Sequence, residues 1–259
     1  MKINFKKRLQ EINFYIKQIP DELPSTQNTQ VIKSHIRVSI ILLCSHFEGS
    51  LKDIIKTHIE NLNLLNLTCI DIDNRLYAKN AIGMSINSLK DINYIIKFLD
   101  NYKIALNENK VINLKSENFN NTESNPTPEL IIKLFKIFGF ENIIDSLNYE
   151  LLFLKPTYEQ IDFLKETERE QLQKFLSKKN IIKINQILSK SRPNKKQVYK
   201  YGFYKYINDL LLARNKIVHG DSSFYLSKHD VIELKHGIFK LLCGLNGKLN
   251  ENITAIQQA

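Results

Sequence analysis

Cysteine is scarce in this sequence, and its few copies form no metal-binding pattern. Cys44, Cys69 and Cys243 lie far apart in apolar surroundings, with no C-x-x-C pair among them. Disulfide scaffolds and zinc sites need several cysteines at short, regular spacings. The three side chains are therefore predicted to be buried thiols in a reducing compartment.

Long hydrophobic runs are missing too, as are the signatures of several enzyme classes. No run approaches the ~20 apolar residues that a membrane-spanning helix needs, and the basic N-terminus leads into an amphipathic helix rather than a signal-peptide core. We therefore expect a cytoplasmic protein without a membrane partner. HExxH, GxxxxGK[ST], GxGxxG, GxSxG and paired acidic metal clusters are also missing. Metalloenzymes, nucleotidases and serine hydrolases therefore have little support, and neither a metal nor a cofactor is expected.

What the sequence does contain is helical periodicity along most of its length. Residues 3–19 carry apolar positions at helical spacing up to Pro20, and residues 29–63 form a long candidate helix that includes Val31, Val38 and Phe47. Both patterns indicate helices with one apolar face. The other candidate helices span residues 84–106, 128–139, 141–154, 158–176, 207–220 and a final segment from Ser227. An all-α fold is predicted, with the long helix as its central scaffold.

One stretch interrupts this periodicity. Residues 113–128 are rich in Asn, Ser and Pro, which predicts a loop. Thr127 as the N-cap and Pro128 at the first helical position predict that a helix begins directly after it. We interpret residues 107–180 as an insertion-like segment within a single helical domain, 1–259.

The most informative stretch is the apolar helix that ends in Arg214-Asn215-Lys-Ile-Val-His219-Gly220. Gly220 is placed to stop the helix in the left-handed conformation, so His219 falls in the last turn. The free carbonyls there favour a positively charged side chain, and a histidine so placed can give or take a proton. Asn215 lies one turn earlier and is placed to orient the ring. We call Arg214, Asn215 and His219 the Arg/His motif.

The two charged members of this motif do not share a helix face. Arg214 and His219 are five residues apart, which separates them by about 140° around an ideal helix. Two solutions are open. Either the last turn is distorted, or the two residues meet at a surface built from more than one copy of the helix.

The Arg/His motif resembles the R-x(4–6)-H signature of HEPN domains. The likeness extends to the RiboL-PSP-HEPN branch through Ser45-His46-Phe47-Glu48 on the scaffold helix and through the closing segment 226–242. It implies a HEPN-type helical bundle with additional helices inserted between the scaffold helix and the motif helix. It also implies a dimeric ribonuclease that works without metal, often as a toxin or an abortive-infection effector against phage.

Two positions leave alternatives open within this resemblance. Glu48 is either an orienting partner of Arg214 or His219, or a solvated carboxylate. Some HEPN toxins carry a tyrosine two residues after the histidine, which an antitoxin nucleotidyltransferase modifies, but Asp221 stands at that position here. The resemblance therefore does not extend to control by that modification.

Positive charge is concentrated immediately before the motif. Residues 178–216, the basic segment, contain eleven basic residues and one acid, while the rest of the chain is balanced at 26 of each. Such a segment is typical of polyanion binding, and its tyrosines could stack on unpaired bases. A solvated face with an apolar stripe is the alternative. The candidate RNA-binding residues are Lys195, Lys196, Lys200, Tyr201, Lys205 and Lys216.

These patterns lead to two functional hypotheses. The first is a metal-independent endoribonuclease in which Arg214, Asn215 and His219 are catalytic, with RNA as substrate, a homodimer as the active form and an antitoxin or defence-complex protein as a further partner. RNA supplies its own nucleophile, the 2′-OH, so cleavage needs only proton transfer and positive charge. The second is a non-catalytic RNA-binding or scaffold module in a multiprotein defence complex.

Overall fold

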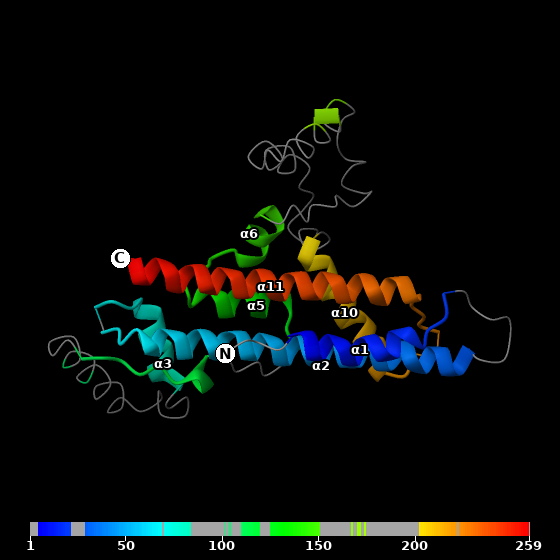
Figure 1. Cartoon of the computed structure of the whole chain (residues 1–259), viewed down its shortest axis with the longest axis horizontal. Helices are drawn as coiled ribbons and strands as arrows, with labels where there is room; N and C mark the ends of the chain where they lie inside the picture. Colours follow the sequence, from blue (N-terminus) through cyan, green and yellow to red (C-terminus); the bar gives the residue numbers. More distant parts are fainter. Residues whose placement is uncertain are drawn as a thin grey trace. The chain divides into compact units, whose positions relative to one another are not determined.

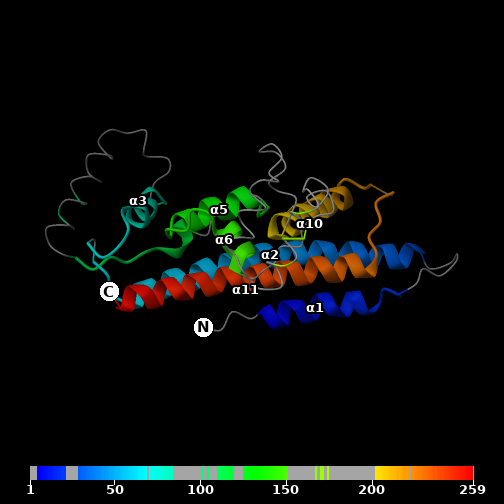
Figure 2. The same cartoon turned by 90° about the horizontal axis from the view of Figure 1, so that it is seen from above.

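The computed structural model describes residues 5–21, 29–68, 70–83, 110–119, 125–150, 202–221 and 223–258, with isolated helical positions at 101, 104, 167, 170, 171 and 174. These ranges fold mostly into helices (Figures 1 and 2). In chain order they are α1 (Phe5–Lys17), α2 (Thr29–Leu64), α3 (Asn74–Gly83), the 3-10 helix η1 (Ser116–Asn118), α5 (Pro128–Lys136), α6 (Ile143–Glu150), α10 (Gly202–Val218) and α11 (Lys228–Gln258). Within the described ranges no strand occurs, only an isolated antiparallel bridge between Thr68 and Val111. The predicted all-α fold is confirmed.

The longest helix, α2, is the predicted scaffold, but its buried face differs from the expected one. Side chains at three- and four-residue spacing are buried: Ile32, Ile36, Ile40, Leu43, Phe47, Leu51, Ile54, His58 and Leu62. Val31 and Val38, which help to predict the helix, are 55% and 37% exposed. Isoleucines and valines occur around the whole first half of α2, so composition alone does not set the rotation of this helix.

The described residues divide into two compact units, and α2 and α11 contribute to both. Unit 1 comprises Met1–Phe14, Leu42–Glu141 and Leu242–Ala259, and unit 2 comprises Tyr15–Ile41 and Asn142–Leu241. The predicted insertion-like segment, 107–180, is therefore divided between the two units. The single-domain interpretation of the sequence remains a prediction.

Unit 1 is held by aromatic packing and by asparagine amides. The Phe135 and Phe138 rings lie 6.4 Å apart, and Phe119 is fully buried beside Phe138. The Asn63 side chain donates to the Leu114 carbonyl and accepts from its N–H, at 2.9 and 2.8 Å. These bonds satisfy an irregular backbone that has no helix or sheet partner.

Helix ends follow the sequence signals closely. The Thr127 hydroxyl accepts from the Leu130 N–H at 3.2 Å, and Pro128 opens α5 as predicted. Gly139 (φ +90°) follows the end of that helix. At the start of α11, Ser227 and Asp230 form a reciprocal capping box: Asp230 accepts from the Ser227 N–H and Ser227 accepts from the Asp230 N–H.

Two close contacts hold α10 in position within unit 2. The Asn148 carboxamide of α6 accepts from the Phe203 N–H at 2.9 Å and so caps the first turn of α10. Gly202 (φ +57°) leaves no space for a Cβ, which would lie 2.3 Å from Asn148 Oδ1. Gly237 on α11 likewise leaves room for the Tyr206 ring, where a Cβ would lie 2.4 Å from the ring. These contacts fix α10 against α6 and α11.

Several predictions fall outside the described ranges or need correction. Residues 84–106, 158–176 and Cys69 lie outside them, apart from the isolated helical positions.

Cys44 is buried as predicted, but Cys243 is exposed, so its predicted burial is wrong. The reason is its place on α11, since it lies off the buried stripe of Leu234, Ile238, Leu241, Leu242, Leu245 and Leu249. Across the ranges described, no helix is long and apolar enough to cross a membrane.

His58 is an unusual member of the unit 1 core. Its side chain is 3% exposed, neither ring nitrogen has a hydrogen-bond partner among the residues described, and the Phe138 ring stands edge-on at 4.9 Å. Burial lowers the pKa of His58 from 6.5 to about 4. The imidazole is therefore neutral in the folded protein, because charging it there costs desolvation free energy that nothing offsets.

This burial predicts a loss of stability in acid. The folded pKa lies below the unfolded one, so the His58 contribution is fully present above pH 6.5 and is lost as the pH falls toward 4. Between pH 7.5 and pH 5 the loss should be about 2 kcal/mol. Urea unfolding gives the free energy of unfolding of wild type and of His58→Leu across this pH range, and the change in their difference with pH measures the loss. A difference that stays constant with pH would contradict the prediction, and His229→Leu, at an exposed position, serves as the control.

Candidate active site

The Arg/His motif lies at the C-terminal end of α10, in unit 2. Phe203, Ile207, Leu210 and Ala213 form the buried face that holds this helix in the core. The helix then ends in a Schellman motif, since the Gly220 N–H donates to the Ile217 carbonyl and the Asp221 N–H to that of Lys216. Gly220 has φ +74°, as predicted from the sequence. His219 is thereby placed at the C-cap.

The last turn of α10 is regular. The His219 N–H donates to the Asn215 carbonyl at 2.9 Å, the ordinary helical bond. Of the two solutions that the spacing of Arg214 and His219 leaves open, distortion of this turn is therefore not the one observed.

The Asn215 side chain binds Arg214, a contact that the sequence does not predict. Its side-chain Oδ1 accepts a hydrogen bond from Arg214 Nη1 at 3.0 Å. Asn215 lies about 40° from His219 around the helix, so this bond draws the guanidinium toward the histidine face. Among the described residues no hydrogen bond joins the Asn215 carboxamide to the His219 ring. The orienting role expected for Asn215 stays a prediction, while its contact with Arg214 is observed.

The motif is accessible. His219 and Asn215 are exposed, and Arg214 is half-buried. Two apolar side chains on the same helix, Leu212 and Val218, are each 55% exposed. A phosphodiester could therefore reach the motif, and apolar surface lies beside it.

A second arginine, which sequence reasoning missed, anchors the loop after the motif. Arg37 on α2 donates through Nη2 to the Asp221 carbonyl at 3.1 Å. The Asp221 carboxylate accepts from the Ser223 N–H and hydroxyl, and the hydroxyl bond is the main cause that lowers the pKa of Asp221. Nothing in the sequence around Arg37 distinguishes it, because its partner is a backbone group 184 residues away.

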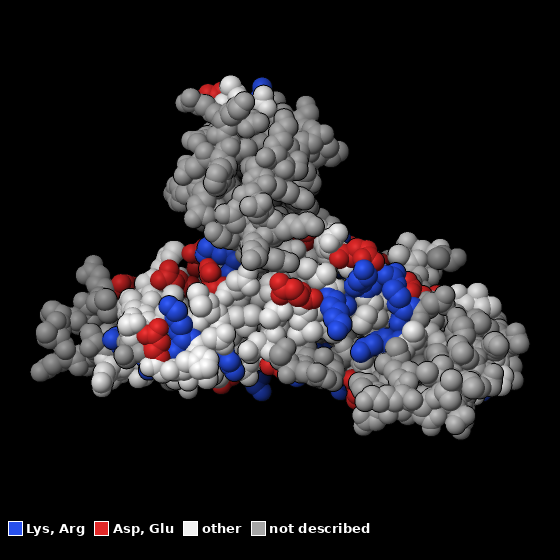
Figure 3. Space-filling model, turned by 180° about the vertical axis from the view of Figure 1, so that it is seen from behind, with Lys and Arg blue, Asp and Glu red and all other residues white. Residues whose placement is uncertain are grey.

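Two of the candidate RNA-binding lysines lie on α10. Lys205 pairs with Asp209 at 2.6 Å, and Lys216 Nζ lies 5.1 Å from the centre of the Phe224 ring. Lys195, Lys196, Lys200 and Tyr201 lie outside the described ranges. On the face seen in Figure 3, basic and acidic side chains of the described residues lie next to one another. This mixture agrees with the charge balance of the chain outside the basic segment.

Glu48 belongs to unit 1, whereas the Arg/His motif belongs to unit 2. Its carboxylate accepts from Lys52 Nζ at 2.7 Å, one helical turn along α2. The neighbouring His46 ring pairs with Glu11 at 2.9 Å, and Phe47 is buried. The role of Glu48 as an orienting partner of the motif stays a prediction.

The sequence matches the RiboL-PSP-HEPN family over residues 3–166, well over half of the chain. This range includes the scaffold helix α2 and ends before α10, so the Arg/His motif is an observation independent of the match. No curated protein and no solved structure matches. With this match over a helical fold, the chain belongs to the RiboL-PSP-HEPN family.

Proposed function

We propose that this protein is a metal-independent endoribonuclease of the HEPN type. The observation that carries the proposal is the Arg/His motif at an exposed helix end, with Arg214 drawn toward the histidine face by Asn215. Family membership independently supports an RNA-related function. The cleavage of RNA by its own 2′-OH needs the chemistry that these side chains supply.

Each residue has a distinct role in the proposed reaction. The His219 imidazole takes the proton from the 2′-OH or gives one to the departing 5′ oxygen. Within the described part of the chain Arg214 keeps four of its five N–H donors after the bond to Asn215, enough to bind two phosphoryl oxygens as charge builds on them. Asn215 acts as the positioning residue of Arg214. The 2′-OH oxygen bonds to phosphorus as the 5′ oxygen leaves, giving a 2′,3′-cyclic phosphate and a 5′-hydroxyl.

A homodimer is part of the proposal. One helix end supplies a single histidine and a single arginine, whereas a two-fold axis beside His219 would supply two of each to one cleft. Leu212 lies within about 20° of His219 around the helix, so exposed apolar surface sits on the same face. Such surface is typical of a protein–protein contact.

The family resemblance suggests the biological setting. HEPN ribonucleases often act as toxins or abortive-infection effectors, so we propose a toxin or anti-phage effector with an antitoxin or defence-complex partner. The alternative is a non-catalytic RNA-binding or scaffold module. One observation favours it: His219 occupies the C-cap, where a histidine can stabilise the helix end without taking part in catalysis.

Incubation of the purified protein with RNA in EDTA distinguishes these two functions. We expect cleavage in the chelator, with products that carry 2′,3′-cyclic phosphate and 5′-hydroxyl ends. A substrate with a single 2′-deoxy nucleotide at the scissile position should resist cleavage there. Cleavage of that substrate at the modified position would contradict the mechanism, and binding without cleavage in every condition would favour the scaffold.

The basic segment makes a separate prediction about binding. Replacing Lys195, Lys196 and Lys200 together by glutamine should weaken RNA binding for all sequences alike. The slope of log affinity against log salt should fall by about 2, since each phosphate contact with a single strand contributes about 0.7. Filter binding across a salt series measures the slope. Lys56, Lys115 and Lys133, exposed in unit 1, form the matched control triple, and an equal change in both triples would mean that the segment makes no specific contacts.

A further inference from the structure

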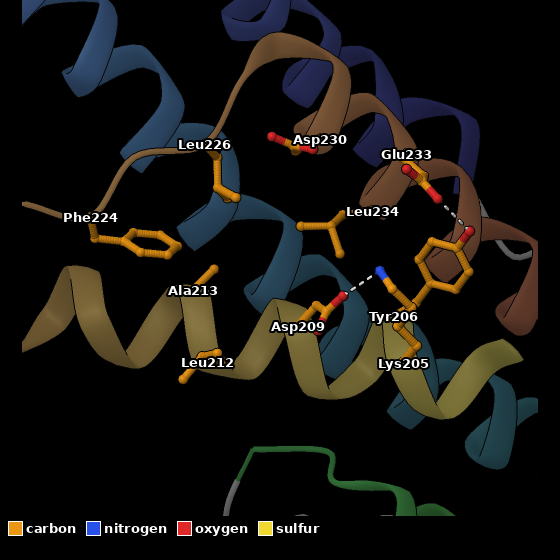
Figure 4. A pocket seen from close by; sticks show the side chains of 10 residues that line it. All are labelled: Lys205, Tyr206, Asp209, Leu212, Ala213, Phe224, Leu226, Asp230, Glu233 and Leu234. Atoms are coloured by element: carbon orange, nitrogen blue, oxygen red, sulfur yellow. Dashed lines mark hydrogen bonds and ion pairs between the residues drawn. The ribbon is translucent and has the colours of Figure 1, made fainter. Parts of the chain in front are cut away.

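Unit 2 contains a cavity that the proposed reaction does not use. It has a volume of about 200 Å³ and lies between α10, the loop 224–227 and the first turns of α11 (Figure 4). Ligand pockets for nucleotide-sized molecules usually measure about 300–1,000 Å³. This cavity is therefore of a size for one side chain or a small group.

One end of the cavity offers hydrogen-bond acceptors. Glu233 Oε1 accepts from the Tyr206 hydroxyl at 2.9 Å, and Asp209 Oδ2 accepts from Lys205 Nζ at 2.6 Å (Figure 4). Within the described part of the chain, the second oxygens of both carboxylates have no partner. Burial is the main cause that raises the pKa of Tyr206, so its hydroxyl stays protonated and keeps Glu233 in place. An occupant of this end has to bring N–H donors.

The other end is apolar. Phe224 and Leu226 extend from the loop, and Ala213 points toward them from α10 (Figure 4), while Leu212 also lines the cavity. Hydrocarbon or a flat cation can pack there, because the Phe224 ring offers a face and the leucines offer methyl groups. The cavity is thus divided into an apolar part and an acceptor part.

Charge decides between the occupants that this division allows. Three carboxylates line the cavity, Asp209, Asp230 and Glu233, against the lining cation Lys205, while a second cation, Lys216, lies over the Phe224 ring. The resulting excess of negative charge repels the phosphates that accompany a nucleobase and attracts a cation. A planar guanidinium on a hydrocarbon stem matches both ends.

We propose that this cavity receives an arginine side chain from a basic segment of a partner protein, with the guanidinium on Glu233 and Asp209 and the stem against Leu226 and Phe224. The site is separate from the Arg/His motif, and the proposal does not require RNA cleavage. Lys205 is the residue that an incoming arginine replaces. Its exposed pair with Asp209 is an i,i+4 contact of the kind that contributes little to stability, so the exchange meets little resistance.

Peptide binding to the full chain tests the assignment. The probe is a fluorescein-labelled octapeptide of alternating leucine and arginine, and the matched probe carries citrulline, which is uncharged, in place of each arginine. Fluorescence anisotropy should show that Glu233→Gln weakens binding of the arginine peptide about tenfold, since one charge-assisted contact is lost while the amide still accepts from Tyr206. Asp209→Asn should weaken it as well. Lys205→Ala should strengthen it, because the competing cation is removed.

A carboxylate outside the cavity provides the control. Glu251→Gln, at an exposed position on α11, should leave binding unchanged. Equal binding of the citrulline peptide, no binding of the arginine peptide, or insensitivity to Glu233→Gln would each overturn the proposal.

Two competing occupants are distinguished by the same variants. The first competitor is an eight-nucleotide RNA. If it competes with the peptide, binds more weakly to Lys205→Ala and binds more tightly to Glu233→Gln, the cavity is a base pocket and the proposal is overturned. A peptide spanning residues 186–200 would overturn the assignment to a partner protein if it bound tightly and responded to the three variants as the arginine peptide does. The occupant would then be a segment of this chain.

Discussion

Replacing His219 or Arg214 by alanine is expected to lower RNA cleavage by at least about 100-fold in each case, which is the lower range for loss of a general acid–base or of a transition-state charge partner. The melting temperature should change little. His219 is exposed and Arg214 half-buried, so each change should cost less than about 1 kcal/mol of unfolding free energy. A gel assay of RNA cleavage, with thermal unfolding of the same preparations, measures both quantities.

Three further variants make this result specific. Arg214→Lys keeps the charge but loses the planar fork, so it should recover only part of the activity. Asn215→Ala removes the acceptor that holds Arg214 Nη1 and should lie between wild type and Arg214→Ala. His229→Ala, at an exposed histidine in the first turn of α11, should cleave as wild type does. Activity that survives in both His219→Ala and Arg214→Ala would end the assignment of the motif as catalytic.

The parts of this fold that the sequence predicts are those fixed by local chemistry. Thr127 and Pro128 specify the start of α5 because a hydroxyl acceptor and a proline suit the first turn of any helix. In the same way, Ser227 with Asp230 specifies the start of α11. Gly220 after His219 specifies the end of α10. Each signal involves residues a few positions apart, so no knowledge of the tertiary fold is needed.

The parts that the sequence does not predict depend on distant partners. Val31 and Val38 are as apolar as the buried Ile32 and Ile36, and only packing decides which of them faces the core. Asparagine and arginine side chains bind backbone groups of the segment that carries the motif, across 55 and 184 residues. Neither residue type indicates such a partner in the sequence. The candidate site is therefore predictable as a set of residues, while the contacts that hold the set in place are not.

The match to the family and the motif are separate lines of support for a ribonuclease. The match ends at residue 166, and the motif occupies positions 214 to 219. A non-catalytic scaffold protein of the same family would also match the family, but it would not need an accessible Arg/His pair. The exposure of Asn215 and His219, together with the Arg214–Asn215 bond, is therefore what favours catalysis over a purely structural role.

The proposed dimer predicts that an inactive chain suppresses an active one. When wild-type and His219→Ala chains are co-expressed in equal amounts and pair at random, about one quarter of the dimers contain two wild-type chains. The reference is an equal total amount of protein made of wild-type chains only. If one cleft needs both histidines, cleavage by the mixture should be about one quarter of this reference, whereas independent sites would give about one half. Differently tagged chains allow the heterodimer to be purified and assayed alone, and it should be nearly inactive.

The same geometry predicts that the dimer can be broken without touching the motif. Leu212→Asp puts a charge on exposed apolar surface on the His219 face of α10, so it should give a monomer in light scattering and abolish cleavage, while α10 stays folded. Leu64→Asp, at a side chain that is 77% exposed at the end of α2, is the matched control and should remain dimeric and active. A monomeric Leu212→Asp protein with full activity, or a purified heterodimer with half the wild-type rate, would show that one helix end is sufficient. The separation of about 140° between Arg214 and His219 would then be bridged within a single chain, through the bond that Asn215 already makes to the arginine.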